Sequence, residues 1–252
     1  MARPLVLLCN DDGYRAPGIL ALGSSLREWA EVVICAPEHE QSAASHALSL
    51  HRPLRLSEHG SGVFSVDGTP ADCVYVALHT IGRVLPRRPD LVASGLNRGA
   101  NLGLDVFYSG TVAAAREGAL RGIVSLALSA AVEVDVQAAV RYSSRIARAA
   151  LARGSPAPLL LNVNFPAGSD WPARATRLGN RVYGDDVWFR HDPQGKEYLW
   201  IGGPSMAHRP LSGSDTEAFD QGVVGVTPLA LDLWAPHEQG RAEEVVALLA
   251  EL

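Results

Sequence analysis

The sequence predicts an α/β fold in which a mainly parallel sheet lies between two layers of helices. The first observation is a short, fully apolar segment at residues 5–9, which is typical of a strand buried on both faces. The second is that similar apolar segments alternate with segments of helical spacing through the first half of the chain. Strands that alternate with helices form parallel sheets, because each helix carries the chain back across a face of the sheet.

The first half of the chain supplies most of the expected elements. Residues 17–29 have helical spacing and follow the first strand. A second helix at 69–79 is favoured by Thr69 as N-cap, with Pro70 in the first helical position and Asp72 three residues after the cap. The other elements expected in this half are strands at 32–36, 91–94, 124–129 and 159–164, and helices at 111–122 and 138–152.

The last third of the chain is richer in Trp, Tyr, Gly and Pro. Residues 187–191 and 196–201 flank DPQG, which is a turn by composition, so these residues predict a β-hairpin. Trp188, Tyr198 and Trp200 place large aromatic rings on the hairpin. Such a hairpin is typical of a contact between subunits, although it can equally fold back on its own domain. The remaining expected elements are a strand at 223–227 and a helix at 242–252.

The composition is that of a folded globular protein with a sizeable core: 252 residues, 47% hydrophobic and 19% charged. The formal net charge of -5 gives no overall basic footprint for nucleic acid or an anionic membrane. Cys9, Cys35 and Cys73 lie among apolar neighbours without a Cys-x-x-Cys pair, so we expect core residues in a reducing compartment. The absence of a signal-peptide pattern and of a membrane-length apolar stretch predicts a cytoplasmic location.

Asp11 and Asp12 directly follow the first predicted strand. Ligands of parallel sheets bind beyond the carboxyl ends of the strands, and two further polar loops, 37–45 and 94–101, follow strands at that edge. Two adjacent carboxylates repel, so one takes up a proton unless a cation compensates the charge. Hard oxygen ligands suit Mg²⁺ or Mn²⁺, which favours a metal site. The alternative is that one aspartate caps the next helix while the other faces solvent.

The other two loops offer further oxygen donors. The loop after the second strand contains Ser42 and Ser45, and the later loop contains Asn97 and Asn101 among glycines. An asparagine carbonyl oxygen is a hard ligand, whereas a hydroxyl is a weak one. Both residue types are also common in ordinary turns, which is the alternative interpretation of these loops.

Ser109, Gly110 and Thr111 lead into the helix predicted at 111–122. A helix start with free backbone N–H groups and hydroxyls can bind an anion, and an ordinary Ser/Thr cap is the alternative. A metal site beside an anion site, at the edge of a parallel sheet, indicates a phosphate ester as substrate.

Several common motifs are absent from the chain. There is no GxxxxGK[ST] phosphate loop, no GxGxxG after the first strand and no HExxH zinc motif. The only lysine, Lys196, lies far from the polar loops in sequence. The chain therefore does not carry the standard signatures of P-loop NTPases, dinucleotide-binding enzymes or zinc proteases.

Four segments, NDDGYRAPGI, GTPADCV, SGLNRGANLG and YSGTVAAAREG, together resemble the SurE family of 5'-nucleotidases (survival protein E). The resemblance extends from near the start of the chain to about Leu128, and more loosely through NVNFP, YLWIGG and VTPLALDL. It implies a Rossmann-like three-layer α/β/α sandwich in residues 1–172. It also implies that residues 173–252 form a hairpin and C-terminal segment that exchange between the subunits of a homodimer or homotetramer, rather than an independent domain.

The resemblance also implies the activity, which is divalent-metal-dependent hydrolysis of nucleoside 5'-monophosphates with one Mg²⁺ or Mn²⁺ per subunit. It leaves open whether 3'-monophosphates and short polyphosphate are substrates. The family's metal ligands correspond to Asp11, Asp12, Ser42 and Asn97 of this chain. The family usually has glycine after this serine, whereas Ala43 stands here. If this position needs a positive φ, alanine strains the loop and can displace Ser42.

The expected mechanism is an in-line attack of water on phosphorus, with Asp11 or Asp12 orienting the water or accepting its proton. Asn10, Asn101 and the helix start described above are expected to hold the phosphoryl oxygens. The nucleoside is expected near residues 68–70 or against the hairpin of a partner subunit.

Two other functions share an acidic pair after the first strand. A phosphatase that forms an aspartyl-phosphate needs Asp-x-Asp spacing and a separate lysine, whereas Asp11 and Asp12 are adjacent and Lys196 is misplaced. A phospho-receiver signalling domain needs an acceptor aspartate at the end of a central strand. The segment LVASGLN has none, and the chain is too long for a lone receiver.

Overall fold

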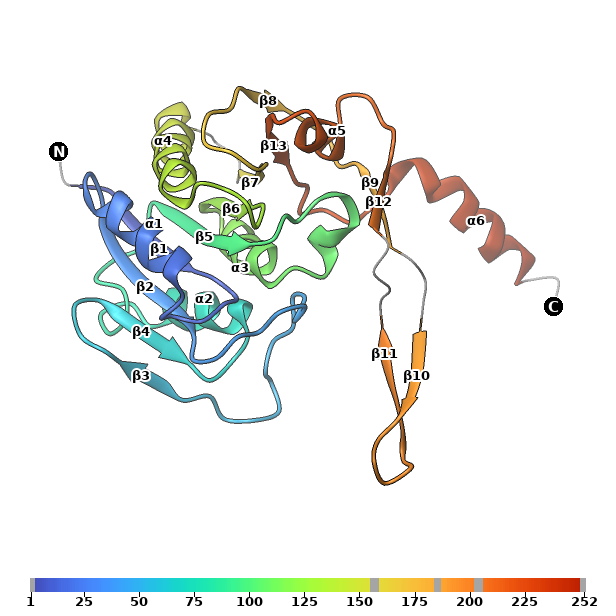
Figure 1. Cartoon of the computed structure of the whole chain (residues 1–252), viewed down its shortest axis with the longest axis horizontal. Coiled ribbons are helices and arrows are strands. Elements are labelled where there is room, and N and C mark those ends of the chain that lie inside the picture. The colour runs from blue at the N-terminus through green and yellow to red at the C-terminus, as the bar shows by residue number, and fades with distance from the viewer. Residues whose placement is uncertain (1–2, 155–158, 184–186, 202–205, 250–252) are drawn as a thin grey trace.

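A mixed sheet lies at the centre of the molecule, with helices on both of its faces (Figure 1). This computed structural model describes residues 3–154, 159–183, 187–201 and 206–249. The strands of the main sheet are β1 Leu5–Cys9, β2 Glu31–Pro37, β3 Leu56–Glu58, β4 Val63–Val66, β5 Leu91–Arg98, β6 Val124–Ala130, β7 Leu160–Phe165, β8 Ala173–Ala175 and β13 Val224–Pro228. Within the described residues these nine strands have the order β3-β4-β2-β1-β5-β6-β7-β13-β8.

The middle of this sheet is parallel, from β4 through β2, β1, β5 and β6 to β7. All five residues of β1 are buried, because the strand has a neighbour on each side and helices over both faces. This arrangement explains why Leu5–Cys9 is apolar throughout rather than alternating. The predicted α/β sandwich with a mainly parallel sheet is confirmed.

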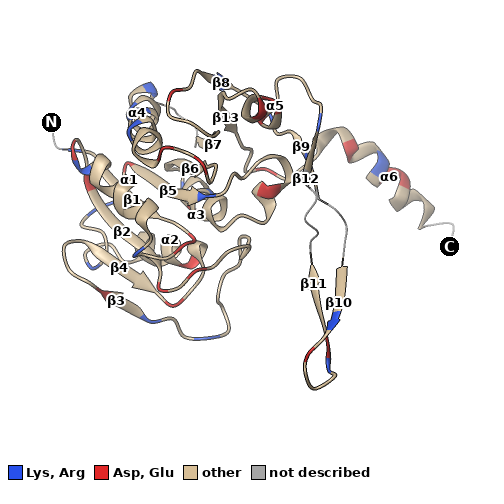
Figure 2. Cartoon of the chain, in the orientation of Figure 1, with Lys and Arg blue, Asp and Glu red and all other residues tan. Residues whose placement is uncertain are grey.

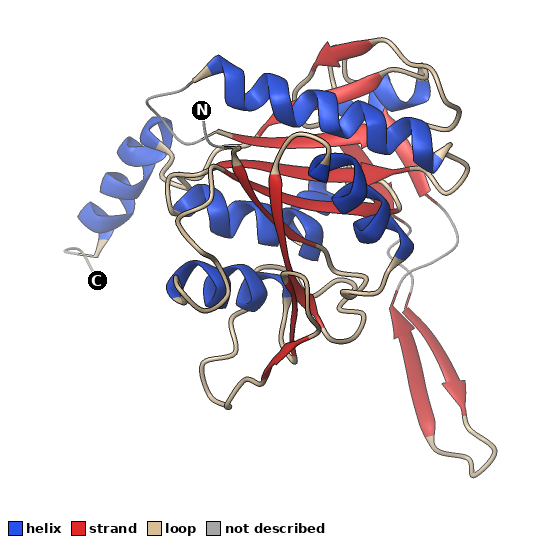
Figure 3. Ribbon diagram, turned by 90° about the vertical axis from the view of Figure 1, so that its left-hand side faces the viewer, coloured by secondary structure: helices blue, strands red, loops and turns tan. Residues whose placement is uncertain are grey.

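Two helices cover each face of the parallel region (Figure 3). Helices α1 (Pro17–Arg27) and α4 (Val136–Arg153) pack together on one face, and α2 (Pro70–His79) and α3 (Gly110–Leu120) pack together on the other. The predicted cap of α2 is confirmed: the Thr69 hydroxyl accepts from the backbone N–H of Asp72, and the Asp72 carboxylate accepts from that of Thr69.

Strand β5 continues to Arg98, beyond the end predicted at residue 94. Its register with β6 shifts between Ser94 and Asn97, and the polar residues around this irregularity resemble a loop in the sequence. Gly95 has a φ of +134°, and a Cβ there would lie 2.3 Å from the carbonyl oxygen of Leu128. The irregularity therefore requires glycine, and it carries Asn97 and Arg98 on the strand to the carboxyl edge of the sheet.

The edges of the sheet depart from the parallel pattern. Strand β3 pairs antiparallel with β4, and β13 pairs antiparallel with β7. Strand β13 agrees with the expected strand at 223–227, whereas the short strands β3, β4 and β8 were not expected. The main sheet includes β8 and β13, which come from the last third of the chain. The division into 1–172 and 173–252 stays a prediction.

The predicted hairpin is confirmed as β10 (Val187–His191) and β11 (Glu197–Ile201), an antiparallel pair that extends away from the sheet (Figure 3). The side chains of both strands are exposed. A second antiparallel pair is formed by β9 (Asn180–Tyr183) and β12 (Met206–Arg209). The remaining helices are α5 (Asp215–Asp220) and the terminal α6 (Gln239–Leu248), which was expected at 242–252; residues 250–252 lie outside the described part.

Charges of both signs are scattered over the elements, with several basic residues on α4 (Figure 2). Cys9, Cys35 and Cys73 are buried and free, as expected for core residues. Among the described residues, no helix is both long and apolar enough to span a bilayer.

Candidate functional site

The turn after β1 places Asp11 and Asp12 at the carboxyl edge of the sheet. The turn is closed by a hydrogen bond from Asn10 Nδ2 to the carbonyl oxygen of Gly13, 2.9 Å long, and Gly13 has a φ of +96°. Helix α1 begins at Pro17 after Ala16, and no side chain caps it. The alternative in which an aspartate serves as the cap of this helix is therefore wrong, and both carboxylates need another explanation.

Asp11 is buried, with only 6% of its surface exposed. Its Oδ1 accepts a hydrogen bond of 2.5 Å from the hydroxyl of Thr111, in the first turn of α3. Burial raises the pKa of the Asp11 carboxyl above its ordinary value, and the bond from Thr111 opposes this rise. Gly110 permits the close approach, because a Cβ there would lie 2.9 Å from the Cβ of Asp11.

Asp12 is half-buried beside the first carboxylate. Burial, followed by the negative charges of Asp11 and Glu40, raises the pKa of Asp12 to about 6. A hydrogen bond from the backbone N–H of Arg98 opposes this rise. The Oδ1 of Asn10 is also buried at this turn and has no hydrogen-bond partner. The turn therefore concentrates oxygen atoms and negative charge in a partly buried place.

The loop after β2 is attached to both the aspartate turn and the segment that precedes α3. The backbone N–H of Gln41 donates to the carbonyl oxygen of Asp11 at 2.8 Å. Ser45 donates through its N–H to Tyr108 O at 3.0 Å and through its hydroxyl to Phe107 O at 2.6 Å. These bonds hold the loop against the aspartate turn, although the loop is polar and has no regular secondary structure.

Ser42 is exposed in this loop, and its hydroxyl donates to Glu40 Oε1 at 2.7 Å. The next residue, Ala43, has a φ of +58°, so the position does adopt the left-handed conformation that favours glycine. The strain expected at Ala43 is therefore present. The structure pairs the Ser42 hydroxyl with Glu40 rather than with either aspartate.

Asn97 lies near the end of β5 and is half-buried. Its Nδ2 donates to the carbonyl oxygen of Gly99 at 2.8 Å, which directs the side-chain oxygen away from that contact. Asp12 and Asn97 line the same cleft, whose volume is about 390 Å³. The structure therefore brings together the two oxygen donors that lie 85 residues apart in the chain, at positions 12 and 97.

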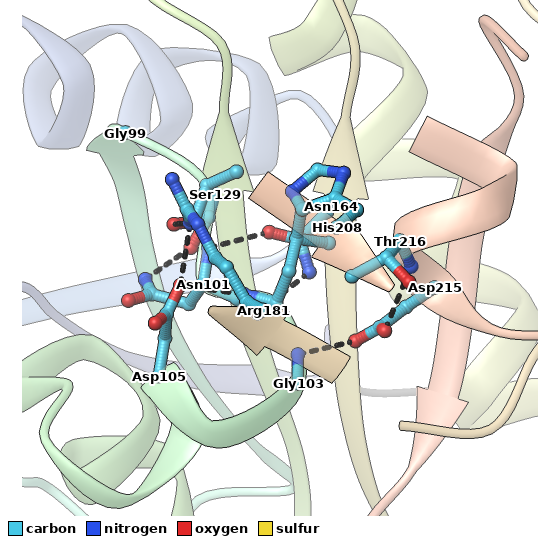
Figure 4. A network of polar contacts seen from close by, with 12 residues as sticks. Gly99, Asn101, Gly103, Asp105, Ser129, Asn164, Arg181, His208, Asp215 and Thr216 are labelled. Atoms are coloured by element: carbon cyan, nitrogen blue, oxygen red, sulfur yellow. Dashed lines mark hydrogen bonds and ion pairs between the residues drawn. The ribbon is translucent and has the colours of Figure 1, made fainter. Parts of the chain in front are cut away.

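Asn101 is buried in a network of amide hydrogen bonds (Figure 4). Its N–H donates to Asn164 Oδ1 at 2.8 Å, and its side-chain Nδ2 donates to Ser129 Oγ at 2.8 Å. Its carbonyl oxygen accepts from Nδ2 of both Asn162 and Asn164, at 2.8 and 3.0 Å. Strands β6 and β7 thus hold the loop that follows β5 in one conformation.

This network was not predicted from the sequence. Asn162 and Asn164 stand at alternate positions of β7 and are buried. Two asparagines within a strand of buried, otherwise apolar residues are a signal, because buried amides need partners. Arg181 of β9 extends the network, donating to the carbonyl oxygen of Ala100 at 2.9 Å and to Asp105 at 2.5 Å (Figure 4).

The start of α3 lies against Asp11, as the polar sequence before the helix suggested. Ser109 is the N-cap, and its hydroxyl accepts from the N–H of Val112 at 3.1 Å. The Thr111 hydroxyl donates its hydrogen bond to Asp11. Both hydroxyls therefore have partners within the chain. The backbone N–H of Thr111 also donates to the Asp11 carboxylate, which leaves the N–H of Gly110 as the donor that this helix start offers.

Within the ranges that the structure describes, no cluster of three or more His, Cys, Asp or Glu side chains could hold a metal ion. A cation at the aspartate turn would therefore complete its coordination with amide or hydroxyl oxygens and water, a ligand set that suits Mg²⁺ or Mn²⁺ rather than Zn²⁺.

The chain is similar to known proteins of one family. Residues 6–185 match the family model described as "Survival protein SurE". The chain is 61% identical over 252 residues to a 5'-nucleotidase SurE of Sorangium cellulosum, covering 98% of this chain and 97% of the relative. It is 46% identical over 237 residues to a 5'-nucleotidase SurE of Geobacter sulfurreducens, covering 90% and 88%. The crystal structure of the SurE protein from Aquifex aeolicus superposes with a TM-score of 0.83 at 36% identity, covering 96% of this chain and 99% of that one.

Proposed function

The chain belongs to the survival protein SurE family and is a nucleoside monophosphate phosphatase, and on this premise we propose that Asp11 and Asp12 hold its catalytic cation. The observation that carries the proposal is the pair itself. Asp11 is buried, Asp12 is half-buried, and the pKa of each carboxyl is raised above its ordinary value. A divalent cation would remove the repulsion that raises the pKa of Asp12, so these residues fit a metal.

Asn97 and Ser42 complete the proposed set of protein ligands, with one Mg²⁺ or Mn²⁺ per subunit. Asn97 suits this role because its amide nitrogen is held by Gly99. Ser42 has first to leave Glu40, and it then offers only a neutral hydroxyl. The two carboxylates therefore contribute most of the affinity for the cation, and Ser42 contributes least.

When bound, the cation supplies positive charge to the phosphoryl oxygens as negative charge develops on them. Residues of the chain position the cation and the attacking water. Thr111 donates its hydroxyl to Asp11 Oδ1 and so holds the carboxylate in one orientation. Asp12, at the wall of the cleft, is the carboxylate placed to orient the attacking water and to accept its proton.

The start of α3 is proposed to bind the phosphoryl oxygens through the N–H of Gly110 and, once it is released from Asp11, through that of Thr111, with Ser109 capping the same helix turn. Asn101 can contribute the second hydrogen of Nδ2, since the first is donated to Ser129. Asn10 stays a proposed phosphate ligand through the second hydrogen of its Nδ2, since the first is donated to Gly13, and its unpartnered Oδ1 suits a water or a cation.

The test is phosphate release from a panel of nucleoside 5'-monophosphates with Mg²⁺, Mn²⁺ or EDTA, for the wild type, Asp11→Asn and Asp12→Asn. Glu31→Gln, an exposed acid at the start of β2, is the control. We expect release that EDTA abolishes and that each aspartate variant lowers at least ~100-fold. Release that survives EDTA, or variants as active as the control, would contradict the proposal. Adding 3'-monophosphates and short polyphosphate to the panel sets the breadth of the activity.

We also propose that the β10–β11 hairpin joins subunits into a homodimer or homotetramer. Trp188, Phe189, Tyr198, Trp200 and Ile201 are between 44% and 84% exposed. An apolar surface of this kind is rarely left in contact with water. Sedimentation analysis of Trp188→Asp together with Trp200→Asp should give a monomer. A cytoplasmic location also stays a prediction.

A further inference from the structure

Helix α3 carries a buried acid, Glu117, which the proposed site does not use. Only 2% of its surface is exposed, and most other buried residues of the helix are small or apolar. A carboxylate in such a place is costly unless it is paired. At 1.5 Å per residue, Glu117 lies about 9 Å further along the helix than Thr111, which contacts Asp11. The acid therefore needs partners of its own, and it lies within two helical turns of the site.

Two side chains pair with the two oxygens of this carboxylate. Arg121, one turn further along α3, donates to Oε1 from Nη2 at 3.0 Å and from Nε at 3.2 Å. His46, in the loop after β2, has its Nε2 3.0 Å from Oε2. Since a carboxylate only accepts, this nitrogen carries the hydrogen. The bond from His46 lowers the pKa of the Glu117 carboxyl below its ordinary value, against the effect of burial, and Arg121 lowers it further.

The bond between His46 and Glu117 closes a cycle of contacts that includes the aspartate turn. The start of α3 is attached to this turn by the hydrogen bond from Thr111 to Asp11. The loop after β2 is attached to the same turn by the bond from the Gln41 N–H to the Asp11 carbonyl oxygen, 2.8 Å long. Glu117 then connects α3 to the loop. Residues 41–46 are therefore held at one end by the aspartate turn and at the other end by α3.

This short segment needs attachment at both ends, because its backbone is strained. Ala43 and Ser45 have φ values of +58° and +52°, and residues other than glycine adopt this conformation only when their surroundings enforce it. The hydroxyl bond of Ser45 lies at the surface, whereas His46 is bound to a buried, charged acceptor. Hydrogen bonds to charged groups are the stronger kind. Ser42 lies between the two attached ends, at Gln41 and His46, and moves if either is released.

We propose that His46 is a positioning residue, which keeps Ser42 beside the aspartate turn by binding its loop to the buried carboxylate of Glu117. The inference rests on the proposed metal site. Without this bond, only a fraction of the molecules would hold the loop in place. The apparent affinity for the cation would fall in proportion to that fraction, whereas the loaded enzyme would still turn over at nearly the normal rate.

The two partners of Glu117 provide a matched pair of variants. His46→Ala and Arg121→Ala each leave the buried carboxylate with one partner, so both should lower Tm. Only His46→Ala detaches the loop. His46→Gln is the conservative variant, because its amide nitrogen can donate to Glu117 in place of Nε2.

Hydrogen exchange over residues 41–46, measured by mass spectrometry in EDTA, tests the attachment without a cation or a substrate. We expect His46→Ala to exchange about tenfold faster or more, and Arg121→Ala and His46→Gln to stay within about threefold of the wild type. Exchange of His46→Ala at the rate of the wild type would overturn the proposal. Equally fast exchange in both alanine variants would also overturn it, because the loop would then respond to the pairing of Glu117 rather than to its own attachment.

A titration of phosphate release from AMP with Mn²⁺ tests the effect on the site. We expect His46→Ala to raise the Mn²⁺ concentration at half-saturation about tenfold, to change kcat at saturating Mn²⁺ less than about threefold, and His46→Gln to restore the wild-type titration. Faster exchange with an unchanged Mn²⁺ titration would overturn the positioning role. Release that needs no cation, with the expected pattern of exchange in EDTA, would instead overturn the proposed metal site and support the attachment of the loop by His46.

Discussion

Gly110 permits the contact on which the proposed site depends, and Gly110→Ala tests it. A Cβ at this position would lie 2.9 Å from Asp11 Cβ and 3.0 Å from Pro70 Cγ. Neither neighbour is the free end of a flexible side chain. Non-bonded carbons rest about 3.5–4.0 Å apart, so the start of α3 must move away from Asp11 by about 0.5–1 Å. The 2.5 Å hydrogen bond between Thr111 and Asp11 would lengthen accordingly.

The cost follows from two contributions. Overpacking of this kind costs about 1–3 kcal/mol, and weakening a hydrogen bond to a buried carboxylate adds about 1 kcal/mol. A loss of about 3 kcal/mol lowers Tm by about 6–12 °C in a protein of this size. Because the cation and phosphate sites meet at this contact, kcat/KM for AMP should fall at least ~10-fold.

Thermal unfolding and steady-state phosphate release measure the two effects. Gly240→Ala is the control, because no atom lies within 4 Å of a Cβ built there and the residue is in α6. Its Tm should stay the same or rise slightly, since alanine favours helix. If Gly110→Ala kept the Tm and kcat/KM of the wild type, the close approach of α3 to Asp11 would not be the reason for glycine.

Three further predictions concern the same edge of the sheet. Ala43→Gly removes the left-handed strain and should stabilise the protein by about 0.5–1 kcal/mol in urea unfolding; a loss of stability would contradict the φ of +58°. Raising the pH from 4 to 6 should destabilise the metal-free protein, because the folded state keeps a proton on Asp12 (pKa about 6) that the unfolded state, at 3.8, releases. The rise in Tm given by Mg²⁺ should consequently be larger at pH 7.5 than at pH 5, and a rise independent of pH would contradict the assignment of Asp12 as a ligand. Asn164→Ala removes two hydrogen bonds to Asn101 and should lower the free energy of unfolding by about 2–4 kcal/mol. Ser143→Ala removes a buried hydroxyl without a partner and should lower it by less than about 1 kcal/mol, so equal losses of Tm would contradict the network.

The fold could be predicted wherever local sequence determines structure. The cap of α2 was recognised because Thr69, Pro70 and Asp72 act within four residues of one another. The buried strands were recognised because both faces are covered and the residues are therefore apolar. Short edge strands such as β3 and β8 were missed, since three residues carry little signal and their pairing depends on distant segments.

The site was predictable in its chemistry and less so in its geometry. The carboxyl edge of a parallel sheet gathers loops from different parts of the chain, so Asp12 and Asn97 could be placed together from the sequence. The orientation of Ser42 towards Glu40 depends on one hydrogen bond, which no sequence pattern predicts. The support of Asn101 by β7 depends on contacts across more than sixty residues, although the buried asparagines of that strand were a signal.

Asp11 and Asp12 are proposed to hold one divalent cation, and the most direct measurement is anomalous diffraction from crystals grown with Mn²⁺. We expect one anomalous peak per subunit, about 2.0–2.3 Å from oxygens of both carboxylates, and no such peak in Asp11→Asn crystals grown in the same way. A peak elsewhere, or none at saturating Mn²⁺ in a crystal of active enzyme, would contradict it.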